Sequence, residues 1–279
     1  MMDFFKYDFD YAWPWTYGHL IAAIVFAGLA ALAYWLNWTR LAILAGVLSI
    51  WGLCGAYIIH GPLRFSRPVA LPTERFLPTG SGRVLDAGAG SGRSTLMVLL
   101  SRPAAKVVAL DRFTGYYGIV DNTPDRLRAN ARAAGAGERV EIEVGDMREM
   151  PFEDGSFDGV VSVAAIDHLN RDGVERTLAE VTRVLRPEGQ FLLMVVNPDI
   201  WTRIAMPFLH GHGYFGGRAH PERWRSQLSA AGLEVVEEGT QPASLYFLTQ
   251  KASRPVTEAR RRTPRPLRAL PGTDLERGD

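Results

Sequence analysis

Residues 84–95 constrain the fold of this chain more than any other stretch. They read Val-Leu-Asp-Ala-Gly-Ala-Gly-Ser-Gly-Arg-Ser-Thr, with three alternate glycines after the acidic Asp86. The apolar residues 83–85 predict a strand, the glycines a tight turn, and residues 91–95 the start of a helix. Glycine tolerates positive φ and lets a ligand approach the backbone, and the free N–H groups at a helix start attract anions. The stretch therefore predicts a strand, a turn and a helix built around a ligand.

Strand-like and helix-like segments alternate along the chain after this turn. Strands are expected at 106–110, 140–144, 159–163 and 191–196, and helices at 91–100, 123–134, 174–185 and 221–231. Two last strands, at 233–237 and 244–250, are expected to pair as an antiparallel hairpin. Alternation of this kind is typical of α/β proteins. The expected fold class is therefore α/β, with a Rossmann-like, mostly parallel sheet and a C-terminal antiparallel hairpin.

Two charge-free runs precede the sheet. Residues 11–39 and 41–63 contain no Asp, Glu, Lys or Arg, and a turn around Arg40 separates them. About 20 apolar residues are enough to span a bilayer, so each run is long enough. Residues 18–61 are therefore expected to form a hairpin of two transmembrane helices. A cleaved signal peptide fits less well, because the N-terminus is acidic and a second run follows; buried helices of a soluble protein are the other alternative.

The charges that flank the hairpin predict its orientation. Arg64, Arg67 and Arg75 follow the second run, whereas the turn between the runs holds only Arg40. Basic residues are enriched on the cytoplasmic side of membrane proteins. We therefore expect an integral membrane protein whose large domain faces the cytoplasm.

Composition divides the chain into segments and limits its partners. The segments are an aromatic and acidic N-terminus (1–17), the hairpin (18–61), a proline-punctuated linker (62–79), the α/β domain (80–250) and a basic, proline-rich tail expected to be disordered (251–279). Lys and Arg number 31 against 30 Asp and Glu, so no nucleic-acid partner is expected. The single cysteine, Cys54, excludes an intrachain disulfide and a cysteine-based zinc cluster.

Three motifs in register carry a family resemblance. The pattern D-x-G-x-G-x-G at 86–92 resembles the first motif of class I S-adenosylmethionine-dependent methyltransferases. The patterns G-D-M-x-x-x-P-F-x-D-G-S-F-D at 145–158 and L-R-P-E-G-Q at 185–190 are similar to the type 11 branch, which includes the quinone-biosynthesis C-methyltransferases. The resemblance implies S-adenosyl-L-methionine as the cofactor.

The same resemblance implies a set of cofactor contacts. Asp86 would meet the ammonium of the methionine moiety, and Asp111, at the end of the second strand, the ribose hydroxyls. Asp146 and Met147 would belong to the adenine pocket. The complete set of expected cofactor-binding residues is Asp86, Ala87, Gly88, Gly90, Gly92, Asp111, Arg112, Asp146, Met147 and Ala164.

The acceptor is expected at the rim that follows the strand 159–163. His168 there could act as a general base, because imidazole titrates near neutral pH, or it could simply frame the pocket. An extra segment at 112–122 could be a lid, a membrane-touching surface or a plain loop. Further acceptor-side candidates are Tyr116, Tyr117, Asp167, His210, His212 and Tyr214. No metal site is expected, because the histidines around 210–220 lack a nearby carboxylate pair.

These features together predict a membrane-anchored methyltransferase that acts on a small, lipophilic acceptor, such as a lipid or a quinone-like molecule. One alternative is a catalytically silent S-adenosylmethionine-binding membrane module. Another is a methyltransferase of water-soluble metabolites that uses the hairpin only for localisation. A dehydrogenase that uses the glycine turn for a nicotinamide cofactor is a third. The sequence leaves the oligomeric state open.

Overall fold

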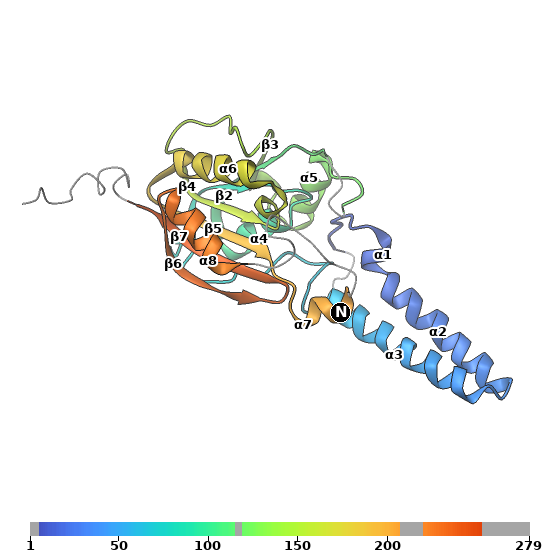
Figure 1. The fold of residues 1–279 in the computed structure, drawn as a ribbon. Coiled ribbons are helices and arrows are strands. Elements are labelled where there is room, and N and C mark those ends of the chain that lie inside the picture. The colour runs from blue at the N-terminus through green and yellow to red at the C-terminus, as the bar shows by residue number, and fades with distance from the viewer. Residues whose placement is uncertain (1–5, 115–118, 207–219, 253–279) are drawn as a thin grey trace, which may run out of the picture.

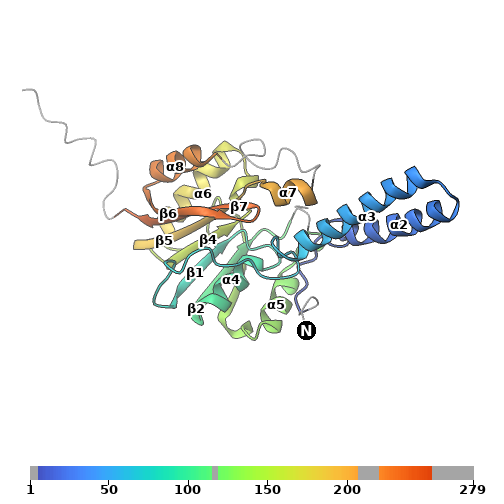
Figure 2. The same ribbon diagram turned by 90° about the horizontal axis from the view of Figure 1, so that it is seen from below.

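An α/β domain and a projecting helical hairpin make up the described part of the chain. The computed structural model describes residues 6–114, 119–206 and 220–252. Figure 1 shows the hairpin leaving the domain beside two short helices, α1 (Trp13–Thr16) and α7 (Ile200–Ala205). The turned view in Figure 2 shows the same projection, with α7 lying beside the domain end of the hairpin.

The domain is organised around a seven-stranded sheet with the order β3-β2-β1-β4-β5-β7-β6. Strands β1 to β5 pair in parallel, whereas β7 runs antiparallel to both β5 and β6. The strands are β1 (Ser81–Ala87), β2 (Ala104–Asp111), β3 (Val140–Val144), β4 (Phe157–Val163), β5 (Leu185–Val196), β6 (Leu233–Gln241) and β7 (Ser244–Lys251). This arrangement confirms the predicted Rossmann-like sheet with its C-terminal antiparallel strands.

Helices cover both faces of the sheet, as Figure 2 shows. The helices of the domain are α4 (Arg93–Ser101), α5 (Pro124–Ala133), α6 (Arg171–Val184) and α8 (Pro221–Ala230). Apolar residues of α6 and α8, with Trp224 the largest, pack in one buried cluster on the sheet. Residues of α4 pack in a second cluster with Phe76 from the segment that precedes β1. Burial of this apolar surface is the main force that holds the layers together.

Local sequence signals set several of the element boundaries. Thr123, the first residue of the predicted helix 123–134, caps α5, because its hydroxyl accepts a hydrogen bond from the N–H of Arg126. The helix α4 begins at Arg93, two residues later than predicted, since Gly92 still adopts the left-handed conformation of the turn. The helix α6 begins at Arg171, three residues earlier than predicted, because the side chain of Asn170 caps it.

One predicted boundary is wrong. We expected a strand at 191–196, but β5 begins at Leu185, directly after α6. Leu185 pairs with Phe157 and Gln190 pairs with Gly159, so the residues between them bulge out of the ladder. A bulge suits Pro187 here, because proline has no N–H to donate to the partner strand.

The hairpin consists of α2 (Gly18–Trp35) and α3 (Thr39–His60), which are long and apolar enough to cross a membrane by length and composition. The two helices lie very close at Gly52, where an added Cβ would lie 2.8 Å from the backbone nitrogen of Ala23. Small residues at helix interfaces permit such an approach. Exposed apolar side chains on the two helices include Leu20, Ile21, Ile24, Val25, Leu29, Leu32, Leu41, Ile43, Leu44, Val47, Ile50 and Leu53.

Candidate functional site

A cavity of about 830 Å³ lies at the carboxyl edge of the sheet. Its lining includes residues at or just beyond the carboxyl ends of four strands, namely Gly88 after β1, Asp111 in β2, Ala164 after β4 and Val196 in β5. Ligands of open α/β sheets bind at this edge, where loops and helix starts converge. The cavity is therefore the candidate active site.

The glycine turn is shaped by a close approach of two loops. Gly88 has a φ of +85°, and a Cβ added there would lie 2.4 Å from the Cβ of Ala165 and 2.9 Å from Cε of Met147. Those distances are far below van der Waals contact, so only glycine fits without displacing the neighbours. The turn is thus held tightly between the loops that follow β3 and β4.

Asp86 lies beneath this turn rather than in the cavity. Its carboxylate is completely buried, and Oδ2 accepts hydrogen bonds from the hydroxyls of Ser94 (2.7 Å) and Thr95 (2.6 Å). Burial raises the pKa of Asp86 to about 6, although the two hydroxyl donors oppose the shift. Oδ1 has no hydrogen-bond partner among the described residues. Asp86 therefore fixes the start of α4, and its contact with the ammonium of the cofactor stays a prediction.

Asp111 lines the cavity at the end of β2. Its Oδ2 accepts a hydrogen bond from the N–H of Gly90 (2.9 Å), and its Oδ1 accepts from the N–H of Phe113 (2.7 Å) and from Nδ2 of Asn122 (3.3 Å). A carboxylate has about four acceptor positions, so it can hold these donors and still accept from a ligand. The residue joins the glycine turn to the second strand at the place where ribose hydroxyls were predicted.

Asp146 faces the cavity with a guanidinium on either side. Arg148 donates two side-chain hydrogen bonds, from Nε (2.9 Å) and Nη2 (2.6 Å), and Nη1 of Arg112 lies 3.9 Å from Oδ2. The hydrogen bonds from Arg148 hold the pKa of Asp146 below its ordinary value. The carboxylate is therefore ionised and can accept a hydrogen bond. Met147 lines the cavity next to it, which fits the predicted adenine pocket.

The loop after β4 forms the rim of the cavity. Ala164 has a φ of 47°, and its N–H donates to the carbonyl of Met194 in β5 (2.8 Å). The following 3₁₀ turn, Ile166–His168, places His168 in the cavity lining. Asp167 is placed differently from our expectation: it is buried, it does not line the cavity, and its Oδ2 accepts from the N–H of Val196 (3.0 Å). This placement gives Asp167 a role in joining the rim to β5.

Several predicted acceptor-side residues cannot be placed. Tyr116, Tyr117, His210, His212 and Tyr214 lie outside the described residues. Among residues 6–114, 119–206 and 220–252, no group of three or more His, Cys, Asp or Glu side chains could hold a metal ion.

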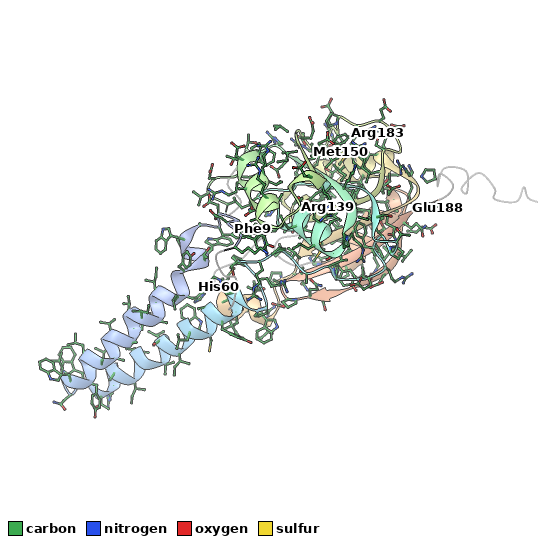
Figure 3. All side chains as sticks on the ribbon, turned by 180° about the vertical axis from the view of Figure 1, so that it is seen from behind. Phe9, His60, Arg139, Met150, Arg183 and Glu188 are labelled. Carbon is green, nitrogen blue, oxygen red and sulfur yellow. The ribbon has the colours of Figure 1, made fainter. Side chains whose placement is uncertain are left out.

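Sequence reasoning missed the contribution of the N-terminal segment and the linker. Tyr11, Trp15, Leu63, Arg64 and Phe65 all line the cavity, although they precede the glycine turn by 20 residues or more. Figure 3 labels Phe9 and His60 close to this junction of hairpin and domain. Such contacts carry no local periodicity, and only the aromatic content of the N-terminus hinted at them.

Arg93, the first residue of α4, holds this junction together. Its Nη1 donates to the Tyr11 hydroxyl (2.9 Å), and its Nη2 donates to the carbonyls of Leu63 (3.2 Å) and Arg64 (3.1 Å). The nucleotide-binding pattern G-x-G-x-x-G places a glycine at this position.

Comparisons with known proteins agree with this geometry. Residues 84–189 match the family model described as "Methyltransferase domain". A methyltransferase of Encephalitozoon cuniculi is 41% identical over 127 residues, which cover 44% of this chain and 50% of that protein. Demethylmenaquinone methyltransferase of Thermus thermophilus is 29% identical over 175 residues, 55% of this chain and 74% of that protein. The 24-methylenesterol C-methyltransferase 2 of Oryza sativa is 34% identical over 110 residues, 39% of this chain and 28% of that protein.

Two of these three matches span half or less of the relative's own length. Among solved structures, an S-adenosylmethionine-dependent methyltransferase from Methanosarcina mazei superposes with a TM-score of 0.51 at 18% identity, covering 67% of this chain and all of that one. That likeness extends the agreement to the fold. Residues 84–189 therefore match a methyltransferase domain, and the motif order and the sheet agree with the S-adenosylmethionine-dependent type.

Proposed function

We propose that this protein is a membrane-anchored, S-adenosylmethionine-dependent methyltransferase that acts on a small, lipophilic acceptor. One observation carries the proposal. The cavity that holds the glycine turn and Asp111 is also lined by Leu63 and Phe65, the residues by which the chain leaves the hairpin. A cofactor site of the methyltransferase type and the base of two apolar helices therefore share one cavity.

The cavity residues fit the cofactor. Gly88 lines the cavity with backbone alone, and its missing Cβ lets Ala165 and Met147 pack against the turn. The start of α4 directs N–H groups and a positive dipole end at the turn, which suits a carboxylate. Asp111 and the ionised Asp146 present acceptors for hydroxyl and amino groups. When bound, S-adenosylmethionine supplies a methyl group that is already activated by a sulfonium.

His168 is the proposed proton acceptor at the rim. The lone pair of the acceptor forms the new bond to the methyl carbon while the carbon–sulfur bond breaks and its electron pair stays on sulfur. An acceptor that carries a proton on its nucleophilic atom must release that proton to a base. His168 lines the cavity, and an imidazole can take up a proton near neutral pH. The remaining rate acceleration would come from holding the reactants aligned.

The proposed membrane attachment rests on the hairpin. The helices α2 and α3 expose apolar side chains over most of their length, and a polar solvent would oppose that exposure. Arg64, Arg67 and Arg75 follow α3, which favours a cytoplasmic position for the domain. Two relatives are named for demethylmenaquinone and for a methylenesterol, both of which are apolar molecules.

The decisive experiment measures where a labelled methyl group goes. The purified full chain, in detergent, is incubated with methyl-labelled S-adenosylmethionine, membrane lipids of the producing organism and its water-soluble metabolites. We expect label in the lipid fraction. Label only in the aqueous fraction would support a methyltransferase of soluble metabolites. Calorimetric binding of S-adenosylhomocysteine without any transfer would support a silent module, and binding of NADH in its place would support a dehydrogenase.

A further inference from the structure

The hairpin is fixed to the carboxyl edge of the sheet by specific side-chain contacts. Nε2 of His19 in α2 donates to the carbonyl of Ala205, and Nε1 of Trp51 in α3 donates to the carbonyl of Ile204 (3.0 Å). The two rings also meet edge to face, with their centroids 4.8 Å apart. Both carbonyls belong to α7, which follows β5 directly. The hairpin is therefore docked against the element that leaves the carboxyl end of a central strand.

An apolar cluster fills the space beneath this docking site. Ile58, Ile59 and Leu63 from the end of the hairpin are buried together with Ala205 of α7. Partly buried residues packed against them are Phe65, Ile204, Met206 and Ala243. Ala243 lies in the turn between β6 and β7. The end of the hairpin, α7 and the β6–β7 turn thus pack together at the base of the hairpin, mainly through apolar contacts.

Arg93 closes the other side of the same junction. Its guanidinium carbon lies 5.9, 5.4 and 5.7 Å from the ring centroids of Phe9, Tyr11 and Phe65. Cations are attracted to aromatic faces at such distances. Since Arg93 follows the glycine turn directly, the aromatic segment before the hairpin and the residues after it are both tied to the cofactor side of the cavity.

The cavity consequently has two chemically different halves. The half at the strand ends carries the glycine turn and the carboxylates of Asp111 and Asp146. The other part of the lining, which we call the apolar half, comes from the hairpin base, α1, α7 with the residue after it, and the β6–β7 turn. Its apolar members include Trp15, Leu63, Phe65, Met206, Pro242 and Ala243, and the polar Arg64, Thr202, Gln241 and Ser244 lie among them. In Figure 1, α1 and α7 lie where the hairpin meets the domain. The apolar half is therefore the half nearest the two membrane-type helices.

We propose that this apolar half, formed by the base of the hairpin, is the site for the hydrocarbon tail of the acceptor. The inference rests on the proposed function and deepens it by naming the substrate class: a compact head that reaches the rim at His168, attached to an apolar tail. The tail lies against Leu63 and Met206, and the acceptor enters from the bilayer side of the domain. The hairpin is on this view part of the acceptor site as well as an anchor.

Matched substitutions on the hairpin test this inference. Leu63→Gln places an amide in the proposed tail site, and Met206→Gln does so from the residue that follows α7. Leu53→Gln makes the same change on the exposed surface of α3, at a leucine that is 54% exposed and does not line the cavity. Each full-length variant is reconstituted in phospholipid nanodiscs. Transfer from labelled S-adenosylmethionine to lipids of the producing organism, and calorimetric binding of S-adenosylhomocysteine, are measured for each.

We expect Leu63→Gln and Met206→Gln each to lower transfer to the lipid fraction by at least about fivefold, because an unpaired amide would face an apolar tail. Binding of S-adenosylhomocysteine should stay within roughly twofold of wild type, which also shows that the domain is folded. Leu53→Gln should change neither quantity.

Other outcomes overturn the inference in distinguishable ways. If both cavity variants transfer methyl groups to lipid at the wild-type rate, the proposed tail site is wrong, whereas the proposed methyltransferase activity is unaffected. Transfer by wild type only to water-soluble acceptors likewise contradicts a tailed acceptor. A variant that loses S-adenosylhomocysteine binding together with transfer shows damage to the cofactor site instead of a tail site. If the wild-type protein transfers no methyl group to any fraction, the proposed function itself is contradicted.

Discussion

Replacing Gly88 with alanine should weaken cofactor binding by more than the loss of protein stability alone would predict. The new Cβ would lie 2.4 Å from Cβ of Ala165 and 2.9 Å from Cε of Met147. The methionine end can rotate away, but the Ala165 methyl is fixed to a backbone that must shift. Forcing such a contact costs about 1–3 kcal/mol, and an L-residue at the φ of +85° adds roughly 1–2 kcal/mol.

Gly232→Ala is the matched control for this change. Gly232 has a φ of +80°, and nothing lies within 4 Å of a Cβ added there. The control therefore carries the backbone strain without the collision. The difference between the two variants isolates the steric term of about 1–3 kcal/mol, which corresponds to roughly 2–12 °C in melting temperature for a domain of this size.

The assay combines thermal melting in detergent with calorimetric titration by S-adenosylhomocysteine. We expect Gly88→Ala to melt below Gly232→Ala and to bind the ligand at least about tenfold more weakly, because the shifted turn no longer presents its N–H groups. Gly232→Ala should bind as wild type does. If Gly88→Ala melts with the control and retains full affinity, the tight packing of the turn has no bearing on ligand binding, and the reasoning is refuted.

Three further outcomes are expected. The pKa of Asp86 is raised from 3.8 to about 6 in the folded protein, so the folded state retains its proton between these values while the unfolded state has lost it. The stability that this proton contributes below pH 3.8 is lost as the pH rises above 6, by about 3 kcal/mol in all and by about 2 kcal/mol between pH 4.5 and 7. Asp86→Asn should lack this fall, and urea unfolding at pH 4.5 and 7 measures it; equal pH slopes for both proteins would contradict the assignment. Arg93→Ala should release Tyr11 and the segment after the hairpin, lower stability by about 2–3 kcal/mol and raise protease cleavage at 62–79, whereas unchanged proteolysis would show that Arg93 does not brace the junction. His168→Gln should lower kcat about 100-fold with unchanged S-adenosylhomocysteine affinity if His168 is the base, and a drop below threefold would leave it a framing residue.

The sequence allowed accurate prediction where the signal was local. The glycine turn, the Thr123 cap and the acids after β2 and β3 are each set by a few neighbouring residues, and the structure places Asp111 and Asp146 in one cavity. The mostly parallel sheet followed from the alternation of strands and helices. The predicted start of β5 was wrong because Leu185 already pairs with β4 ahead of a bulge. Such pairing depends on the partner strand and cannot be predicted from the sequence of the bulged strand alone.

Contacts between distant segments could not be predicted in the same way. Arg93 and Tyr11 are 82 residues apart in the chain. Asp167 was read as an acceptor contact because it lies on the rim that follows β4. Adjacent residues in a 3₁₀ turn point in different directions, however, and its carboxylate turns inward to Val196. The direction of a side chain in a short turn is decided by its tertiary partners.

The linker between the hairpin and the sheet, residues 62–79, is fixed to both edges of the sheet. This attachment limits how the hairpin can move relative to the domain. At the carboxyl edge, the carbonyls of Leu63 and Arg64 accept hydrogen bonds from Arg93. At the amino edge, Phe76 is completely buried, and the N–H of Leu77 donates to Oε1 of Gln190 (2.7 Å).

A flexible linker would let the domain drift away from the bilayer and would leave the hairpin as a tether only. A linker that is fixed at both edges of the sheet holds the hairpin base in one position relative to the glycine turn. Because Leu63 and Phe65 line the cavity at that position, any movement of the hairpin must also move a wall of the site. The residues that follow α3 are therefore a wall of the cavity, so the proposed anchor and the proposed acceptor site would have to move together.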